Sequence, residues 1–219
     1  MQWIAATTMV VDHLGLYIFA DTAMYEPLRI IGRLAMPLYV YMLTEGFQHT
    51  RNKDKYFWRI LIFAFIAQLP IFILTWLCGL DWYLNAMFGL AAALIALSFA
   101  KRGGWNWLGV IAIALVTQIC NVDYGATMVV LAVGFYLCSR RYMRTGDWLS
   151  CEFGYASVLL MGMLLAYFLS GWKIQIFGVA AIIPIMLYNG QKGLRMPRYF
   201  FYVFYPIHLV PIIALKLLL

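Results

Sequence analysis

Residues 3–20 of this chain read Trp3-Ile-Ala-Ala-Thr-Thr-Met-Val-Val-Asp12-His13-Leu-Gly-Leu-Tyr-Ile-Phe-Ala20. A helix needs about 20 predominantly apolar residues to cross a bilayer, so this stretch predicts a membrane-spanning helix. Asp12 and His13 lie near its midpoint, where an ionisable side chain costs about 2.5–3.5 kcal/mol or more. Such side chains face the protein interior and usually serve a function. A structural clamp between helices is the alternative interpretation of this pair.

The composition extends this interpretation to the whole chain. Of the 219 residues, 65% are hydrophobic and only 11% are charged, whereas soluble proteins average about 45–50% apolar and 25% charged residues. We therefore expect an all-α, polytopic integral membrane helical bundle, formed as a single domain over residues 1–219. The net charge of +7 does not indicate a nucleic-acid partner, because the basic residues lie in short clusters between apolar runs. The four cysteines lack metal-binding spacing, and no metal is expected.

Apolar segments and loop charges predict the topology. Nine segments indicate about nine transmembrane helices, of which the short fifth and sixth either tilt or include one that enters the membrane without crossing. Alternate loops hold 12 of the 16 Lys and Arg residues. Because cytoplasmic loops carry this excess, we expect a cytoplasmic N-terminus and a multi-pass protein of the inner or plasma membrane. The segments are residues 2–20, 29–48, 56–77, 83–100, 105–120, 124–138, 153–170, 173–189 and 199–218. The loop residues are Arg51, Lys53, Lys55, Arg59, Lys101, Arg102, Arg140, Arg141, Arg144, Lys192, Arg195 and Arg198.

Several polar side chains are expected at similar depths inside the membrane. A rise of 1.5 Å per residue places His13 about 16 Å, and His208 about 14 Å, from the cytoplasmic ends of the first and last segments. Asn85 and Gln118 add amides in the external half of the bundle. Together these residues predict a polar chamber between the helices.

Asp12 and His13 project about 100° apart on a helix, so they do not simply face each other. We expect Asp12 to pair with Arg33, because a bidentate guanidinium–carboxylate pair is the least costly way to keep both charges in lipid. A neutral imidazole is expected for His13, since burial disfavours the charged form, and a neutral imidazole is what a general base requires.

Two further features suggest where ligands bind. Pro206 interrupts the last segment beside His208, and the hydroxyl of Tyr205 is expected to point into the chamber. The basic loops have a second interpretation beside membrane orientation, because they would attract a phosphorylated cofactor electrostatically. The loop residues expected to do so are Arg51, Lys53, Lys55, Arg140 and Arg141.

Five short motifs together resemble a known family. They are Val11-Asp12-His13-Leu-Gly-Leu, Gly32-Arg33-Leu-Ala-Met-Pro37-Leu-Tyr, Asn85-Ala-Met-Phe, Asp123-Tyr124-Gly125 and Phe204-Tyr205-Pro-Ile-His208-Leu. In this order they are similar to the TraX family of membrane proteins, over nearly the whole chain. The Asp-His and Gly-Arg-x-Ala-x-Pro-Leu motifs are the specific ones. The founding members act in conjugation and acetylate the N-terminus of pilin.

The resemblance implies an acyltransferase that takes its acetyl group from cytoplasmic acetyl-CoA. The acceptor it implies is a pilin-like peptide or a surface glycan, modified on an amine or a hydroxyl. The catalytic role falls on His13, acting either as general base or as a transient carrier of the acetyl group, with Asp12, Arg33 and His208 in support. Acetyl-CoA would bind at Arg51, Lys53, Arg140 and Arg141. Arg33, Asn85 or Gln118 would stabilise the oxyanion, with Tyr124 and Tyr205 beside the substrate.

Two other functions remain open at this stage. Asp12, His13, Glu45 and His208 are also the kind of residues that form a proton relay in a proton-coupled transporter or export component. Alternatively, the polar residues hold helices together in a non-catalytic membrane assembly factor. A homo-oligomer is compatible with each of the three functions.

Overall fold

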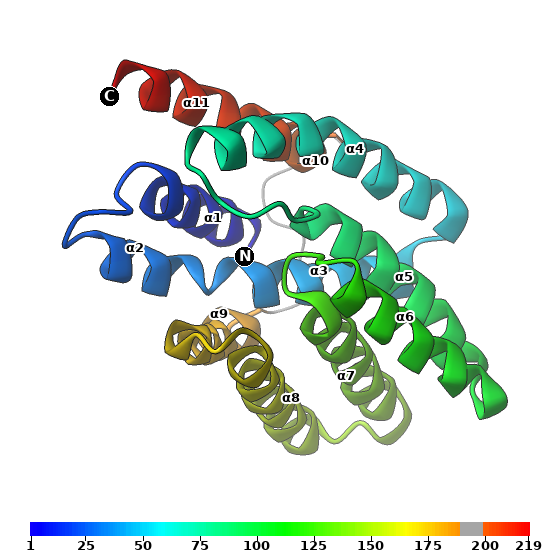
Figure 1. The fold of residues 1–219 in the computed structure, drawn as a ribbon. Coiled ribbons are helices and arrows are strands. Elements are labelled where there is room, and N and C mark those ends of the chain that lie inside the picture. Colours follow the sequence, from blue (N-terminus) through cyan, green and yellow to red (C-terminus); the bar gives the residue numbers. More distant parts are fainter. Residues whose placement is uncertain (189–198) are drawn as a thin grey trace.

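The computed structural model describes residues 1–188 and 199–219, and within them the chain is helical without a β-strand (Figure 1). This confirms the predicted all-α class. The α-helices are α1 (Gln2–Tyr17), α2 (Tyr25–Gly32), α3 (Ala35–His49), α4 (Lys53–Leu77), α5 (Ala86–Arg102), α6 (Trp107–Ile119), α7 (Gly125–Thr145), α8 (Trp148–Ser170), α9 (Ile182–Met186), α10 (Phe200–Ile207) and α11 (Leu209–Leu218). Two 3-10 helices, η1 (Gly104–Asn106) and η2 (Lys173–Ala181), precede α6 and α9.

Among the residues that the structure describes, three helical segments are both long and apolar enough to cross a membrane, namely Lys53–Leu77, Cys151–Ser170 and Phe200–Leu218. The segments Gly104–Ile119 and Lys173–Met186 are apolar but shorter. The outward faces of the helices are also apolar: on α4, for example, Phe65, Leu69 and Trp76 are each at least 65% exposed. Large apolar faces of this kind are stable in lipid rather than in water, which agrees with a membrane protein.

Two predicted segments are each divided into two helices. An interruption was predicted only for the last segment, from Pro206, which lies inside α10 in the structure. The second segment divides into α2 and α3 at Arg33, and the last divides into α10 and α11 at His208. Pro37 and Pro211 are each the third residue of the helix that follows the break. A proline removes the hydrogen bond to the carbonyl four residues earlier, so the chain turns there instead of continuing as one helix. The two breaks place Arg33 and His208 at helix junctions, where their side chains point into the bundle.

Helix α3 lies at the centre of the bundle, packed against α1, α5 and α7 (Figure 1). Its side chains Leu38, Val40 and Phe47 are almost completely buried. Helices α10 and α11 lie along α4, and α11 also contacts α1. The first and last helices of the chain are therefore neighbours, as the predicted chamber requires.

The basic loops after α3, α5 and α7 gather at one end of the molecule. Lys53 and Lys101, which come from two of these loops, line the same surface groove. Gln48, at the end of α3, donates a hydrogen bond of 3.1 Å to Ser139, which directly precedes the basic end of α7. This agrees with the alternation of loop charges in the sequence. Lys192, Arg195 and Arg198 lie outside the described residues.

The structure corrects the predicted placement of Asn85, whose amide does not face a chamber. Its Oδ1 accepts a hydrogen bond from the backbone of Met87 at 3.0 Å, so it is the N-cap of α5. Its Nδ2 donates to the carbonyl of Ala64 and to Oε1 of Gln68, both at 2.8 Å. With both amide hydrogens donated to α4, Asn85 joins two helices and has none to offer an oxyanion.

We therefore expect Asn85→Ala to destabilise the protein by about 2 kcal/mol, because it removes a helix cap and leaves buried groups on α4 without partners. Thermal unfolding in detergent measures this loss. Asn106→Ala is the matched control, since its side chain makes one local bond to the Gly103 carbonyl. Equal stability losses in the two variants would contradict the assigned role.

Candidate functional site

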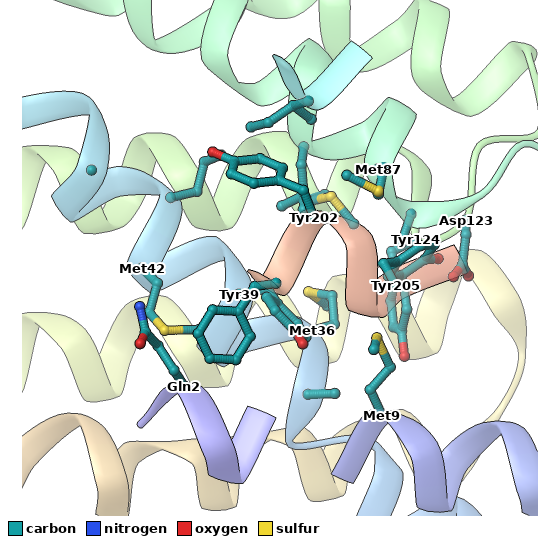
Figure 2. Close-up of a pocket in the computed structure, with 18 of the residues that line it drawn as sticks. Gln2, Met9, Met36, Tyr39, Met42, Met87, Asp123, Tyr124, Tyr202 and Tyr205 are labelled. Atoms are coloured by element: carbon teal, nitrogen blue, oxygen red, sulfur yellow. The ribbon is translucent and has the colours of Figure 1, made fainter. Parts of the chain in front are cut away.

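A cavity of about 430 Å³ runs through the bundle (Figure 2). One face of α3 lines it at helical spacing, through Ala35, Met36, Tyr39, Met42, Leu43, Gly46 and, just after the helix, Thr50. Fifteen residues of helix correspond to a length of about 22 Å. The cavity is therefore elongated along the axis of the central helix.

The two ends of the cavity differ in chemistry. Asp12, His13, Asp123, Tyr124 and Tyr205 line it near the start of α3. Near the end of α3 the lining is formed by Gln2, Thr50, Tyr56, Arg59 and Tyr202. Between them lie mainly methionines and aliphatic side chains, among them Met9, Met36 and Met87, which Figure 2 shows around the open space. An apolar passage thus joins two polar ends.

His13 and His208, which the sequence predicted to share one polar chamber, meet at one of these ends. His13 Nδ1 lies 2.7 Å from His208 Nε2, and the stacked rings have centroids 4.9 Å apart. Both side chains are buried, and only His13 lines the cavity. The second ring nitrogen of His208, Nδ1, lies 3.0 Å from the carbonyl oxygen of Phe204.

These contacts determine which nitrogen of each uncharged ring carries the proton. A carbonyl oxygen can only accept, so His208 Nδ1 must be the donor to Phe204. His208 Nε2 is then the acceptor, and His13 Nδ1 donates to it. The lone pair of His13 therefore resides on Nε2. A neutral imidazole with a free Nε2 is the form that accepts a proton from a substrate.

Asp12 is held by two arginines. Arg33 Nη2 binds Oδ1, as the sequence predicted, and Arg29 Nη1 binds Oδ2 at 2.5 Å. Arg29 is a second partner that the sequence analysis did not identify. It lies four positions before Arg33, so the two guanidinium groups share one face of the helical turn, and this spacing was the signal available in the sequence.

Arg33 is positioned by further contacts. Its Nε donates to the Arg29 carbonyl and its Nη1 donates to Oε1 of Gln175 on η2, both at 3.2 Å. Its guanidinium carbon lies 5.5 Å from the ring centroid of Tyr124. A buried cation with several hydrogen-bond partners costs far less than an unpaired one. The arginine therefore fastens α1, α2 and η2 together.

Gly32 is required for this arrangement. A Cβ atom at position 32 would overlap the carboxylate of Asp12, and one at Gly15 would come within 2.9 Å of Leu28. Helices α1 and α2 can approach closely only because both positions lack a side chain. The short distance lets both arginines reach Asp12, while His13 projects toward α10.

Asp123 and Tyr124 reach the cavity from the turn before α7. Asn121 and Tyr124 both adopt positive φ values, of 50° and 61°. Hydrogen bonds from Leu84 N to the Asn121 carbonyl and from Asp123 N to the Leu84 carbonyl hold the turn. Burial raises the pKa of the Asp123 carboxyl to about 6, although nearby Arg33 acts in the opposite direction.

The remaining predicted residues are placed as follows. Tyr205 is buried against both histidines, with its ring centroid 6.4 Å from that of His13. Arg51 and Lys53 line the basic groove, and Arg140 and Arg141 are exposed on the last turns of α7. The prediction that Gln118 lies in the chamber is wrong. This residue is exposed, accepts a hydrogen bond from Ala126 N and is absent from the cavity lining, because it faces the N-terminus of α7.

Comparison with known proteins places these residues in a family context. A family model described as TraX protein matches residues 1–216. A protein named probable fimbrial assembly protein FimC, serogroup H1, from Dichelobacter nodosus is 32% identical over 238 aligned positions, which cover all of this chain and 95% of the relative. The uncharacterized protein RP591 of Rickettsia prowazekii (strain Madrid E) is 34% identical over 69 positions, or 32% of this chain and 25% of that protein. No solved structure matches.

Because Asp12 neutralises two buried guanidinium groups, we expect Asp12→Ala to cost about 3–5 kcal/mol of stability. Arg29→Ala should cost less stability, since the carboxylate of Asp12 still pairs with Arg33 in that variant. Thermal unfolding in detergent ranks the variants, and Asp21→Ala, which removes an exposed carboxylate, is the control. The assigned pairing would be wrong if Asp12→Ala were no less stable than the Asp21 variant.

Proposed function

Because the chain belongs to the TraX family, we propose that it is a membrane-embedded acetyltransferase that transfers the acetyl group of acetyl-CoA to an acceptor at or across the membrane. The observation that carries this proposal is the elongated cavity, which is lined by Arg59 near a basic end of the molecule and by His13 at the other end. An enzyme that brings a phosphorylated acyl donor to a buried base requires such a passage.

The proposed topology has nine crossings, with the N-terminus and the basic end in the cytoplasm of a cell with an inner or plasma membrane. Acetyl-CoA would then approach from the cytoplasm. The groove that contains Arg51, Lys53 and Lys101 shares Thr50 with the cavity lining, so groove and cavity adjoin. Arg140 and Arg141 add positive charge at the same end and would attract the anionic donor.

In the proposed reaction His13 Nε2 removes a proton from the acceptor amine or hydroxyl as its nitrogen or oxygen attacks the thioester carbonyl. A bond forms between the acceptor and the carbonyl carbon, giving a tetrahedral oxyanion. When the C–S bond breaks, the thiolate of CoA leaves and takes the proton from His13. The hydrogen bond from His13 Nδ1 to His208 persists in the imidazolium and stabilises it.

The hydroxyl groups of Tyr205 and Tyr124 are the proposed donors to the oxyanion, since both residues line the cavity beside His13. Arg33 does not line the cavity, and its three nitrogens each bind a protein oxygen. Its contribution in this proposal is electrostatic and positional: with Arg29 it fixes Asp12 and hence the adjacent His13.

The acceptor in this proposal is a pilin-like peptide or a surface glycan. The relative from Dichelobacter nodosus is named a probable fimbrial assembly protein, which favours the peptide. Mass spectrometry of pilins and surface glycans from a deletion strain would reveal which molecule loses an acetyl group.

A non-catalytic assembly factor is the second candidate, favoured by the same printed name. A proton-coupled transporter has less support. Glu45 lies 3.6 Å from His49 and does not line the cavity. Asp12 already binds two cations. The proposed relay of Asp12, His13, Glu45 and His208 is therefore interrupted in this structure.

The first test is transfer of label from acetyl-CoA to pilin peptide or glycan by the purified protein. His13→Ala should lower the rate by about 10²–10⁴-fold, the usual contribution of a general base. His49→Ala removes the exposed third histidine and should leave the rate unchanged. A wild-type protein that binds no acetyl-CoA, with a His13 variant that keeps its cellular function, would favour the assembly factor.

A second test examines how His208 positions His13. His208→Gln keeps an oxygen that can accept the hydrogen bond from His13 Nδ1, whereas His208→Phe keeps the ring shape and loses the acceptor. We expect the Phe variant to lose on the order of 100-fold in kcat and the Gln variant less than tenfold. The pH–rate profile should shift only in the Phe variant. Equal losses of kcat in the two variants, with unshifted pH–rate profiles in both, would show that His208 only packs against His13.

A further inference from the structure

Arg59 is the one lysine or arginine among the described residues that line the cavity. It lies at the basic end, on the second turn of α4, together with Thr50 and Gln2. The other cations of this end, such as Arg51 and Arg102, are exposed outside the cavity. A ligand that occupies this end of the cavity therefore lies beside Arg59.

The guanidinium of Arg59 is oriented by its neighbours. Its central carbon lies 5.8 Å from the ring centroid of Tyr56 and 6.0 Å from that of Tyr202. Its Nε donates a hydrogen bond of 3.1 Å to the carbonyl of Lys55. Within residues 1–188 and 199–219 no side chain or carbonyl accepts from its two Nη groups, and no carboxylate pairs with it.

This arrangement leaves the Nη groups of Arg59 able to bind a ligand. Aromatic rings near a guanidinium hold it by cation–π attraction and restrict its rotation. The N–H groups at its edge remain able to bind a planar pair of oxygens. These N–H groups form a fork that matches two oxygens of a phosphate and binds them with two parallel charge-assisted hydrogen bonds. An arginine with fixed orientation and open Nη groups is suited to an organic phosphate.

The distance to the histidines fits an acyl donor with a long arm. Tyr56 packs against Gly46 near the end of α3, and Asp12 packs against Gly32 just before its start. The helical part between these points, residues 35–46 of α3, is about 18 Å long. Between them the lining includes five methionines, whose flexible side chains adapt to an inserted chain. A phosphate held at Arg59 would leave a thin arm to run along this section to His13.

We propose that Arg59, placed between Tyr56 and Tyr202, is the anchor for the diphosphate of the acyl donor and so selects nucleotide-linked thioesters over simple ones. This inference rests on the proposed function for the identity of the donor. It assigns to Arg59 a specificity-determining role distinct from the general attraction by the exposed loop cations. Attraction by exposed charges is screened by salt, whereas a bidentate contact at the cavity mouth is screened less.

The test compares the binding of CoA and of pantetheine, which has the same arm and thiol without phosphates, to the purified wild-type protein by calorimetry. Arg59→Gln should weaken CoA binding at least tenfold and change pantetheine binding by less than twofold. Arg102→Gln removes the same charge from the same end outside the cavity, and should change neither affinity more than twofold. Arg59→Lys, which keeps the charge and loses the fork, should fall between Arg59→Gln and wild type.

The inference is overturned if Arg59→Gln weakens both ligands alike, if the Arg102 variant matches it, or if wild-type protein binds CoA no tighter than pantetheine. Thermal unfolding shows whether Arg59→Gln still folds. If it does not, the binding of CoA and pantetheine by Arg59→Lys is compared with wild type instead, and this comparison tests the inference. Label transfer from acetyl-CoA is measured separately on the same samples. Binding of CoA that depends on Arg59 without any transfer would uphold this inference and contradict the proposed enzyme.

Discussion

The buried carboxylate of Asp12, shared by Arg29 and Arg33, is the interaction on which the rest of the structure depends. A charge on an apolar helix is stable only if a partner reaches it inside the bundle. Here two partners come from successive turns of one short helix, and Gly32 provides the space for them. The contact fixes both the separation and the rotation of α1 against α2. Because the direction of one residue on a helix fixes that of the next, it also turns His13 toward the C-terminal helices.

Two prolines help to position side chains of the same site. Breaks before Pro37 and Pro211 cost helical hydrogen bonds, yet they place Arg33 and His208 at junctions rather than within continuous helices. The hydrogen bond between His13 and His208 then joins the first and last helices of the chain. One consequence is that the chemistry of the site depends on the fold being complete, since its two histidines are contributed by opposite ends of the sequence.

The cavity relates this site to the basic end of the molecule. Its two polar ends lie about 20 Å apart along α3, with an apolar middle section between them. In the proposed enzyme, one end would recognise the anionic donor and the other would carry out the chemistry. The chain belongs to the TraX family and is similar over its whole length to a protein named probable fimbrial assembly protein FimC. The family motifs gather around Asp12, His13 and Arg33, so these residues form the structural centre of the molecule as well as its candidate site.

The sequence by itself determined the helical membrane class, the Asp12–Arg33 pair, the presence of His13 and His208 in one polar site, and the gathering of basic loops at one end. These follow from hydropathy, from charge and from the rise per residue, which are local properties of the chain. Only the tertiary structure decided that Arg29 is a second partner of Asp12, that Asn85 caps a helix, that Gln118 faces outward, and that Arg59 lies in the cavity. Each of these depends on the rotation of a helix about its axis. That rotation is set by packing against helices distant in the sequence, and no local pattern records it.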